Sequence, residues 1–384
     1  MNQINMVTIR GRDNETMEKI TKKLNDEQSK IVSASEDRIV VNASAGSGKT
    51  LCAVSRLLEI LHRGIDPSRI VFITFTNAAA AEMRERAGEE AKDVFIGTIH
   101  SYANRLLVSR GVSTSELIDN EDFDGLFELI KENLWCIREV DYLILDEGQD
   151  STAQQFEFLF DIVNPKGWII FSDHRQSIYG FIGAEPNYII KLMDRPDVAV
   201  YYLRNNYRCC DNILNYARSL INKLGFNYID NSLTKRERPG KIIRTWLDKE
   251  KIANYILDTE GNFGDWFVLT RSNAELDEIF EYLQQKGVPC ETFKKKDLTT
   301  DDLKEKMKND TVKVLTVHTA KGLESRYVIV SGVRCYNDEE TRVAYVAATR
   351  ARDLLIWGIG SAPKPKRGYR QRTRVYDDSM DSWE

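Results

Sequence analysis

The residues best suited to chemistry lie together between Ala43 and Thr50, a stretch that reads ASAGSGKT. An apolar run leads into it, and the residues from Leu51 to Leu61 have helical character. Small residues let backbone N–H groups converge on phosphate oxygens, and the N-terminus of the following helix adds the positive end of its dipole. The stretch therefore predicts a nucleotide-binding loop in which Lys49 reaches the β- and γ-phosphates and the Thr50 hydroxyl ligates Mg²⁺. The residues expected to bind the nucleotide here are Ala45, Gly46, Ser47, Gly48, Lys49 and Thr50.

A phosphate loop of this kind works with an acidic site at the end of another strand. The apolar run from Tyr142 to Leu145 ends in Asp146 and Glu147. Asp146 is expected to hold Mg²⁺, and Glu147 to orient and deprotonate the attacking water. Each motif has a plain structural alternative, which is a Gly/Ser turn for the loop and a helix N-cap for the acidic pair. The functional interpretation is favoured because the strand, the lysine, the threonine and the acids all fall where phosphoryl transfer needs them.

The composition describes a globular protein large enough for two domains. The chain has 384 residues, of which 42% are hydrophobic and 29% charged, and a net charge of −5; domains commonly hold about 100–200 residues. A negative balance does not favour general condensation on nucleic acid, so any nucleic-acid site must be a local groove. The cysteines are scattered without a C-x-x-C pair, which favours a reducing compartment. No apolar run approaches the roughly 18–20 residues of a membrane span, and the polar start lacks the core of a signal peptide. We therefore expect a cytoplasmic protein without a membrane partner.

Short apolar runs alternate with helical patterns along the chain, which is typical of an α/β fold with parallel sheets. Polar residues follow several of the strands, so ligands are expected along the C-terminal edge of a sheet. In the first half we expect strands at 38–42, 69–75, 94–97, 142–145 and 168–171, and helices at 15–31, 51–62, 78–87 and 101–109. In the second half we expect strands at 198–203, 241–246, 266–269, 312–317, 327–331 and 354–358, and helices at 211–224, 273–286 and 339–352.

The alternation begins again near 194–198, which predicts two domains. The end of the chain is basic and then acidic, and we expect a disordered tail, with a basic arm that contacts the nucleic-acid backbone as the alternative. The expected divisions are a lead-in at 1–22, a first domain at 23–195 with a small helical insertion at 102–140, a second domain at 196–360 with a reduced, lysine-rich helical insertion at 294–310, and the tail at 361–384.

Two longer motifs narrow the nucleotide site to a family. The residues 146–150, DEGQD, and 171–180, FSDHRQSIYG, resemble motifs II and III of superfamily 1 helicases, and more narrowly those of the UvrD/Rep/PcrA group. The other motifs of that family follow in its order at 24–28, 74–83, 97–101, 206–208, 317–324 and 344–351, so the resemblance spans about 24–358. It implies two RecA-like P-loop domains, each a mostly parallel sheet flanked by helices, with ATP and Mg²⁺ in the cleft between them.

The resemblance implies roles for residues around the nucleotide. Gln28 would read the adenine edge, Tyr207 would stack on the adenine, and Glu324 would bind the ribose. Arg208 and Arg350 would reach the γ-phosphate from the second domain. Positive charge supplied in this way stabilises the negative charge that spreads during phosphoryl transfer, and it makes hydrolysis depend on domain closure. An arginine can equally form a surface ion pair, but the small and apolar neighbours of Arg350 favour a catalytic role.

The resemblance also implies a track for single-stranded DNA across both domains. Gln176 would couple the γ-phosphate to this track. Bases stack on aromatic faces without reading sequence, and Phe75, Tyr179 and Phe181 are the expected stacking residues. Core packing is the alternative for Phe75 and Phe181. Further contacts with DNA are expected from Thr76, His100, Thr316 and His318.

The implied activity is ATP-dependent translocation on single-stranded DNA in the 3′→5′ direction, with unwinding of tailed duplex DNA. Larger members of the family carry insertions that contact duplex DNA, and here the segments at 102–140 and 294–310 are short. This favours a second hypothesis, a DNA-stimulated ATPase that acts as a remodelling or regulatory module without robust unwinding. An RNA-directed activity is a weaker third hypothesis, because motifs III and VI resemble the DNA group.

Overall fold

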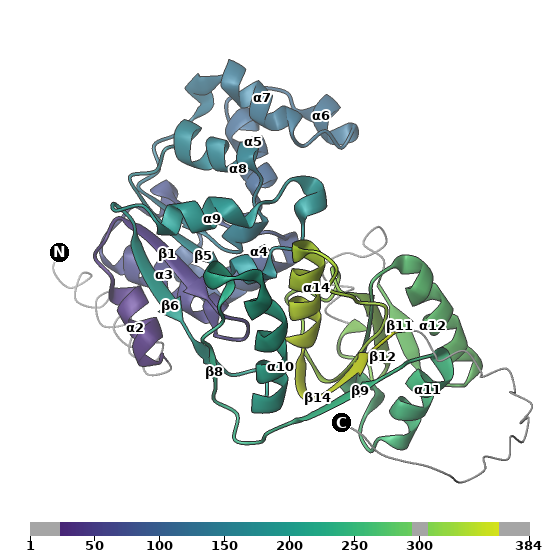
Figure 1. Cartoon of the computed structure of the whole chain (residues 1–384). Coiled ribbons are helices and arrows are strands. Elements are labelled where there is room, and N and C mark those ends of the chain that lie inside the picture. Colours follow the sequence, from purple (N-terminus) through teal and green to yellow (C-terminus); the bar gives the residue numbers. More distant parts are fainter. Residues whose placement is uncertain (1–23, 294–305, 361–384) are drawn as a thin grey trace, which may run out of the picture.

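The computed structural model describes residues 24–293 and 306–360 (Figure 1). Two sheets of six strands each organise these residues, and helices cover their faces. The expected α/β class with two parallel sheets is therefore confirmed. The lead-in at 1–22, residues 15–23 of the helix expected at 15–31, most of the segment at 294–310 and the tail at 361–384 lie outside the described residues. The described part corrects the expected helix, because α2 begins only at Asp26, where the Asn25 side chain caps its N-terminus.

The first sheet contains the strands that lead into the phosphate loop and the acidic pair. Its strands run in the order β3-β2-β4-β5-β1-β6, and every neighbouring pair is parallel. β2, β4 and β5 are buried along their whole length, because helices cover both faces of a parallel sheet, and this explains their continuous apolar sequences. The bounds are β1 (Arg38–Ala43), β2 (Ile70–Ile73), β3 (Phe95–Gly97), β4 (Tyr142–Leu145), β5 (Gly167–Ser172) and β6 (Ala199–Leu203).

The position of β6 corrects the expected arrangement. The strand expected at 198–203 to open the second half instead forms an edge of the first sheet, where Ile39 pairs with Ala199 and Ala43 with Leu203. Alternation along the chain cannot separate the two arrangements, because a strand at a boundary has the same pattern whichever sheet it joins. The chain therefore passes to the second sheet after Leu203 rather than near 194–198.

The second sheet has the strand order β11-β12-β10-β13-β14-β9 and is also parallel throughout. Two short strands, β7 and β8, pair with each other outside both sheets, and β8 lies between the two halves in Figure 1. The bounds are β7 (Asn205–Asn206), β8 (Leu233–Thr234), β9 (Lys241–Thr245), β10 (Trp266–Thr270), β11 (Cys290–Thr292), β12 (Val312–Thr316), β13 (Ser325–Val330) and β14 (Ala351–Gly358).

Helix α14 ends earlier than the sequence pattern indicates. The pattern favours a helix to residue 352, but α14 stops at Ala348, and the Thr349 hydroxyl bonds back to the carbonyl oxygens of Tyr345 and Val346. Arg350 then lies in the turn that enters β14. The α-helices with described bounds are α2 (Asp26–Ser33), α3 (Lys49–His62), α4 (Asn77–Ala87), α5 (Ile99–Val108), α6 (Ser115–Asp119), α7 (Gly125–Glu132), α8 (Ala153–Phe156), α9 (Pro186–Met193), α10 (Asp211–Ile221), α11 (Lys249–Asp258), α12 (Asn273–Gln285) and α14 (Asp338–Ala348).

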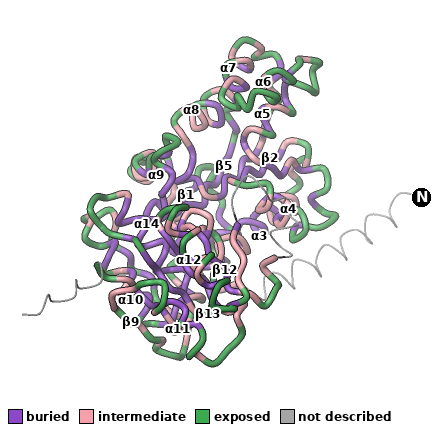
Figure 2. The backbone as a smooth tube through the Cα atoms, turned by 90° about the vertical axis from the view of Figure 1, so that its right-hand side faces the viewer, coloured by how far each residue is buried: buried purple, intermediate pink, exposed green. Residues whose placement is uncertain are grey.

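The segment expected to be a small insertion extends outward from the first sheet, and α5 and α7 share an apolar cluster with strands of that sheet. α5, α6 and α7 form the upper end of the molecule in Figure 1. Figure 2 shows long exposed stretches there, whereas α14 and the central strands β2, β4 and β5 are buried. Within the described ranges, none of the helices is both long and apolar enough to span a membrane.

Candidate active site

A cavity of about 370 Å³ lies between the two sheets. The phosphate loop, from Ser44 to Thr50, lines one side of it together with Glu147 and Gln176. The residues that line it from the chain beyond Leu203 are Tyr207, Arg208, Gly322, Glu324 and Arg350. The structure thus brings together most of the predicted nucleotide site.

The phosphate loop has the geometry that a phosphate group requires. Gly46 and Gly48 have φ angles of +64° and +77°, a region in which a Cβ atom is disfavoured. A Cβ at Gly46 would also lie 2.6 Å from the Cβ of Arg208. The buried Ser47 Oγ bonds to no other atom of the described residues. α3 begins at Lys49, so the N-terminus of a helix and the Ser47 hydroxyl both lie at the cavity, and this fits an anionic phosphate.

Lys49 contacts both acidic residues at the end of β4. Its Nζ lies 2.5 Å from Glu147 Oε2 and 3.9 Å from Asp146 Oδ1. Burial raises the pKa of Asp146. Burial acts in the same direction on Glu147, but the Lys49 and Lys321 ammonium groups outweigh it and lower the pKa of Glu147. Glu147 is therefore held as a carboxylate, the form that a general base requires.

Glu147 also has a strained backbone. Its φ of +54° lies in the left-handed region, which costs a non-glycine residue roughly 1–3 kcal/mol. Its backbone N–H donates to Asp146 Oδ1 at 3.0 Å, and Gln149 Nε2 donates to its Oε2 at 2.6 Å. These bonds hold the carboxylate toward the cavity.

The donors for Mg²⁺ are few, as phosphate-loop sites require. Thr50 lines the cavity beside Lys49, and Asp146 ends β4. The described residues contain no group of three or more His, Cys, Asp or Glu side chains placed to hold a metal. A hydroxyl and a carboxylate nevertheless fit Mg²⁺ in such a site, because the ion keeps several waters and takes further oxygens from the substrate phosphates.

Two residues just after β6 hold the loop from the opposite side. Asn206 is fully buried, and its Nδ2 donates to the carbonyl oxygen of Ala45 at 2.7 Å. The backbone N–H of Tyr207 donates to the carbonyl oxygen of Gly46 at 2.9 Å. No role was predicted for Asn206, although it begins the motif that contains Tyr207 and Arg208.

The arginines expected beyond the first sheet reach the cavity. Arg350 is buried, and its Nη2 donates to Gln176 Oε1 at 3.1 Å across the cleft. Burial, together with the nearby Arg208, lowers the pKa of Arg350 to about 9. Arg208 Nε donates to Glu324 Oε2 at 2.5 Å. Positive charge from the second half of the chain thus lies beside Gln176 and Glu147.

Gln28 is placed behind the phosphate loop and not in the lining of the cavity. Its Nε2 donates to the carbonyl oxygen of Ser47 at 3.1 Å, and its Oε1 accepts from the backbone N–H of Asn25 at 3.0 Å. The Asn25 side chain in turn donates to Tyr207 Oη at 2.8 Å. The Tyr207 side chain is half-exposed at the cavity.

Four of the predicted DNA residues form one aromatic group. Phe75 stacks on Tyr179 at 4.8 Å between ring centroids, and Phe181 lies 5.6 Å from His318. Tyr179 is buried and donates from Oη to the carbonyl oxygen of His318. Phe181 is 70% exposed, which rules out core packing for its ring. The exposed ring of Phe181 therefore packs against the buried ring of Tyr179.

The other predicted DNA residues lie around this group. Thr76 caps the N-terminus of α4, and Thr316 Oγ1 lies 2.9 Å from Thr319 Oγ1. His100 packs against Phe123 and Phe127 of the insertion. Its buried Nε2 has no hydrogen-bond partner among the described residues.

Two cations near the site are absent from the predictions. Lys321 Nζ bonds to Asp150 Oδ2 at 2.5 Å and to the carbonyl oxygen of Gln176 at 2.8 Å. Arg86 of α4 lines the cavity. The position of Lys321 in the stretch VHTAKGLE was the available signal, whereas nothing in the pattern around Arg86 distinguishes it from a surface arginine.

These features define a class of protein: a P-loop nucleotide-binding fold of two parallel sheets, with arginines from one sheet facing the phosphate loop of the other. The model for the UvrD/REP helicase N-terminal domain matches residues 24–137 and 135–197. The model for the UvrD-like helicase C-terminal domain matches residues 291–359. The chain belongs to the UvrD-like family of superfamily 1 helicases, and the resemblance seen in the motifs is confirmed.

Several relatives support this assignment. The ATP-dependent DNA helicase PcrA of Staphylococcus epidermidis is 27% identical over 71% of this chain and 51% of its own length. DNA helicase II of Escherichia coli is 26% identical over 70% of this chain and 51% of its own length. The Gabija protein GajB of Bacillus cereus is 24% identical over 83% of this chain and 92% of its own length. The chain spans about half the length of PcrA and DNA helicase II.

Proposed function

We propose that the protein is an ATP-dependent DNA helicase that translocates on single-stranded DNA in the 3′→5′ direction, with Mg²⁺ as cofactor. One observation carries the proposal: Lys49 and Glu147 line the same cavity as Arg208 and Arg350. The first pair suits phosphate binding and water activation, and the second suits charge stabilisation from the facing sheet. The names of the relatives, which include ATP-dependent DNA helicases, support the same activity.

The chemistry assigns one task to each group. Glu147 takes a proton from the attacking water. Lys49 gives up its contact with Glu147 and binds the β- and γ-phosphates instead. Thr50 and Asp146 would hold Mg²⁺, and the ion would supply positive charge to neutralise the phosphate oxygens. Arg350 and Arg208 stabilise the charge that develops on the transferred phosphoryl group.

Coupling to DNA follows from the position of Gln176. It lies between Arg350 at the cavity and Ile178 and Tyr179, which continue toward the aromatic group that ends at Phe181. Closure of the cleft on ATP would shift the two sheets together and change how bases stack on this group. As part of the proposal, residues 24–203 and 204–359 form the two RecA-like units that move, and single-stranded and tailed duplex DNA are the partners.

The test compares hydrolysis with strand displacement. ATP hydrolysis is measured with and without single-stranded DNA, and displacement is then measured on matched 3′- and 5′-tailed duplexes. We expect stimulated hydrolysis, with displacement from the 3′-tailed duplex. Absence of DNA stimulation in folded protein would exclude the proposal, and displacement from the 5′-tailed duplex alone would reverse the direction.

One structural observation favours a second candidate, a DNA-stimulated ATPase that remodels complexes without robust unwinding. Between Thr98 and Tyr142 the chain forms only the short helices α5, α6 and α7 and a 3₁₀ turn. These short elements leave little protein surface that could contact duplex DNA. Stimulated hydrolysis without displacement at any protein concentration would favour this candidate.

A further inference from the structure

A buried cluster of charged and polar side chains lies on the first sheet beside the proposed active site. Its centre is Arg175, which follows β5 and is 4% exposed. Its Nε donates to Asp173 Oδ1 at 2.6 Å. Its Nη2 donates to Asn42 Oδ1 at 3.2 Å and to Ser44 Oγ at 3.3 Å. Arg175 therefore braces the end of β1 and the start of the phosphate loop.

The partner of Arg175 from the second half of the chain is Asp230. Arg175 Nη1 donates to Asp230 Oδ1 at 3.2 Å. Asp230 is fully buried and is anchored to the second half of the chain, because Arg218 of α10 donates to its carbonyl oxygen at 2.9 Å and α10 packs in the core around the second sheet. Tyr345 of α14 donates from Oη to Asp230 Oδ2 at 2.8 Å. The cluster thus joins the first sheet to α14.

This junction is costly to break. Burial would raise the pKa of Asp230, but the Arg175 guanidinium and the hydrogen bond from the Ser232 backbone N–H outweigh it and lower the pKa. Separating the pair would leave both a guanidinium and a carboxylate buried without compensation. The buried pair of Lys321 and Asp150 joins the two halves in the same way beside the cavity, whereas the bond from Arg350 to Gln176 has a neutral acceptor. The Arg175–Asp230 pair is therefore a stable contact between the first sheet and the second half of the chain.

The cluster also reaches the catalytic arginine by a second route. Gln176 Nε2 donates to Asp173 Oδ2 at 2.7 Å, and Arg350 Nη2 donates to Gln176 Oε1 at 3.1 Å. Asp173 is the same carboxylate that accepts from Arg175. A closed path of contacts, the polar ring, therefore runs through the molecule. It passes from Arg175 through Asp230, Tyr345 and the backbone of α14 to Arg350, and it returns through Gln176 and Asp173.

We propose that Arg175 and Asp230 are positioning residues which, with Tyr345, fix α14 against the first sheet and so set where Arg350 meets the transferred phosphate. Arg342 supports the same docking, because its Nε donates to the carbonyl oxygen of Ser177 at 2.6 Å. The inference rests on the proposed function for its effect on hydrolysis. Its effect on α14 can be measured whether or not the protein is active.

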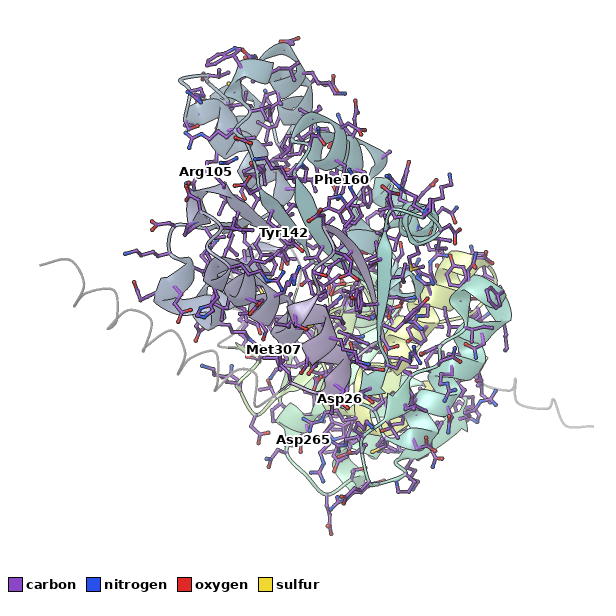
Figure 3. The ribbon with its side chains drawn as sticks, turned by 90° about the vertical axis from the view of Figure 1, so that its left-hand side faces the viewer. Asp26, Arg105, Tyr142, Phe160, Asp265 and Met307 are labelled. Atoms are coloured by element: carbon purple, nitrogen blue, oxygen red, sulfur yellow. The ribbon has the colours of Figure 1, made fainter. Side chains whose placement is uncertain are left out.

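The first test removes one hydroxyl. Tyr345→Phe deletes the bond to Asp230 and keeps the ring, and Tyr142→Phe is the matched control. Tyr142 is a buried tyrosine of the first sheet (Figure 3) that accepts from Arg56 Nη2 at 2.9 Å. Misplacement of a catalytic group can cost up to about 100-fold. We expect Tyr345→Phe to lower kcat for ATP hydrolysis about 10- to 100-fold, with KM for ATP changed less than about twofold, and Tyr142→Phe to change neither.

The second test asks whether the cluster acts through Arg350. In an Arg350→Ala background, Tyr345→Phe should lower kcat by less than about twofold further, because residues that act as one unit are non-additive. Effects that multiply in the double variant would overturn the proposal. So would a Tyr345→Phe enzyme in which KM rises while kcat is unchanged.

The third test does not depend on turnover. Asp230→Asn keeps the shape of the side chain and removes its charge, and it also serves if Tyr345→Phe does not fold. We expect faster amide hydrogen exchange over 338–350 in Asp230→Asn, with exchange in β2 and β4 unchanged. Unchanged exchange over 338–350 would overturn the positioning role, even if the wild-type protein shows no ATP hydrolysis. Absence of hydrolysis with the expected exchange pattern would instead count against the proposed function alone.

Discussion

At the scale of single residues, the contact between Lys49 and Glu147 links the two halves of the proposed chemistry. The ammonium that would bind phosphate and the carboxylate that would accept the proton of water are 2.5 Å apart. Phosphate can draw Lys49 away only by exchanging one negative partner for another. ATP binding and the release of the general base are therefore expected to be a single event.

This contact makes Lys49→Ala the first prediction. Loss of the ammonium should reduce DNA-stimulated ATP hydrolysis by at least about 100-fold, since it removes charge aimed at the phosphates. The matched control is Lys131→Ala, because Lys131 also bonds to two carboxylates, those of Glu128 and Glu157, far from the cavity. Substantial hydrolysis by folded Lys49→Ala protein would contradict the assignment of the phosphate loop.

The pH dependence of stability should carry a signature of Asp150. Burial raises its pKa from 3.8 to about 6, and the Lys321 ammonium only partly offsets this. The folded state then binds the proton more tightly than the unfolded state between about pH 4 and pH 6, so the free energy of unfolding falls as pH rises through this window. The shift corresponds to roughly 3 kcal/mol at 1.36 kcal/mol per unit.

The measurement is urea unfolding of the wild type and of Asp150→Asn at several pH values. The stability of the wild type relative to the variant should fall by up to about 3 kcal/mol from pH 4 to pH 6.5. The loss of the Lys321 contact adds an offset that does not change with pH, so only the slope tests the prediction. A relative stability that rises with pH would mean that Lys321 keeps Asp150 ionised.

At the scale of elements, local patterns predicted the strands well because each buried strand is a short apolar run. They failed at α14 and β6 for physical reasons. The residues after Ala348 have helical propensity, but pairing of β14 with β13 from Ala351 onward and the back-bonded Thr349 end the helix. Which sheet β6 joins depends on partners far along the chain, and no local pattern records them.

The aromatic group shows the same limit on site prediction. Tyr179 and Phe181 were equally plausible stacking residues, but Tyr179 is buried and Phe181 is 70% exposed. The turn that follows η6 (His174–Gln176) determines which of these two rings is exposed. It stacks Tyr179 on Phe75 and leaves Phe181 at the edge of Tyr179. Residue type alone does not tell which of the two rings is exposed and can stack on a base, and which is buried beneath it.

Phe181→Ala is the prediction for this element. A base that stacks on an aromatic side chain gains about 1–3 kcal/mol, so the variant should need correspondingly more single-stranded DNA for half-maximal stimulation of hydrolysis. Basal hydrolysis should be unaffected. Phe226→Ala is the control, because Phe226 is 87% exposed and lies outside the aromatic group. Equal DNA dependence in the wild type and Phe181→Ala would assign base contacts to another surface.

At the scale of the whole molecule, the polar ring through Arg175 lay beyond sequence analysis. Its members are separated widely in the chain, and Asp230 has no motif around it. The sequence predicted most of the residues that line the cavity and the positions of most strands along the chain. It did not predict how the two sheets are held together, since burial of a charge becomes apparent only when distant segments are packed.

The charge of the molecule predicts weak salt dependence of DNA binding. The net charge is −5, and burial lowers the pKa of His100 and of His318, so both are neutral at pH 7. With few phosphates neutralised, the slope of log K against log salt concentration for single-stranded DNA should be shallower than about −3. Fluorescence anisotropy across a salt series measures it. A steeper slope that relaxes when residues 361–384 are removed would assign DNA contacts to the basic arm.

The short strands β7 and β8 give the joint between the sheets a mechanical character. The described chain leaves the first sheet at Arg204, and β8 then returns to pair with β7, so two strands lie side by side at the crossing. A single strand at the crossing would be able to bend and twist about every axis. Two hydrogen-bonded strands bend about one axis and resist bending about the other axes. We therefore expect opening and closing of the cleft to have a single degree of freedom, so that every cycle returns Arg350 along the same arc.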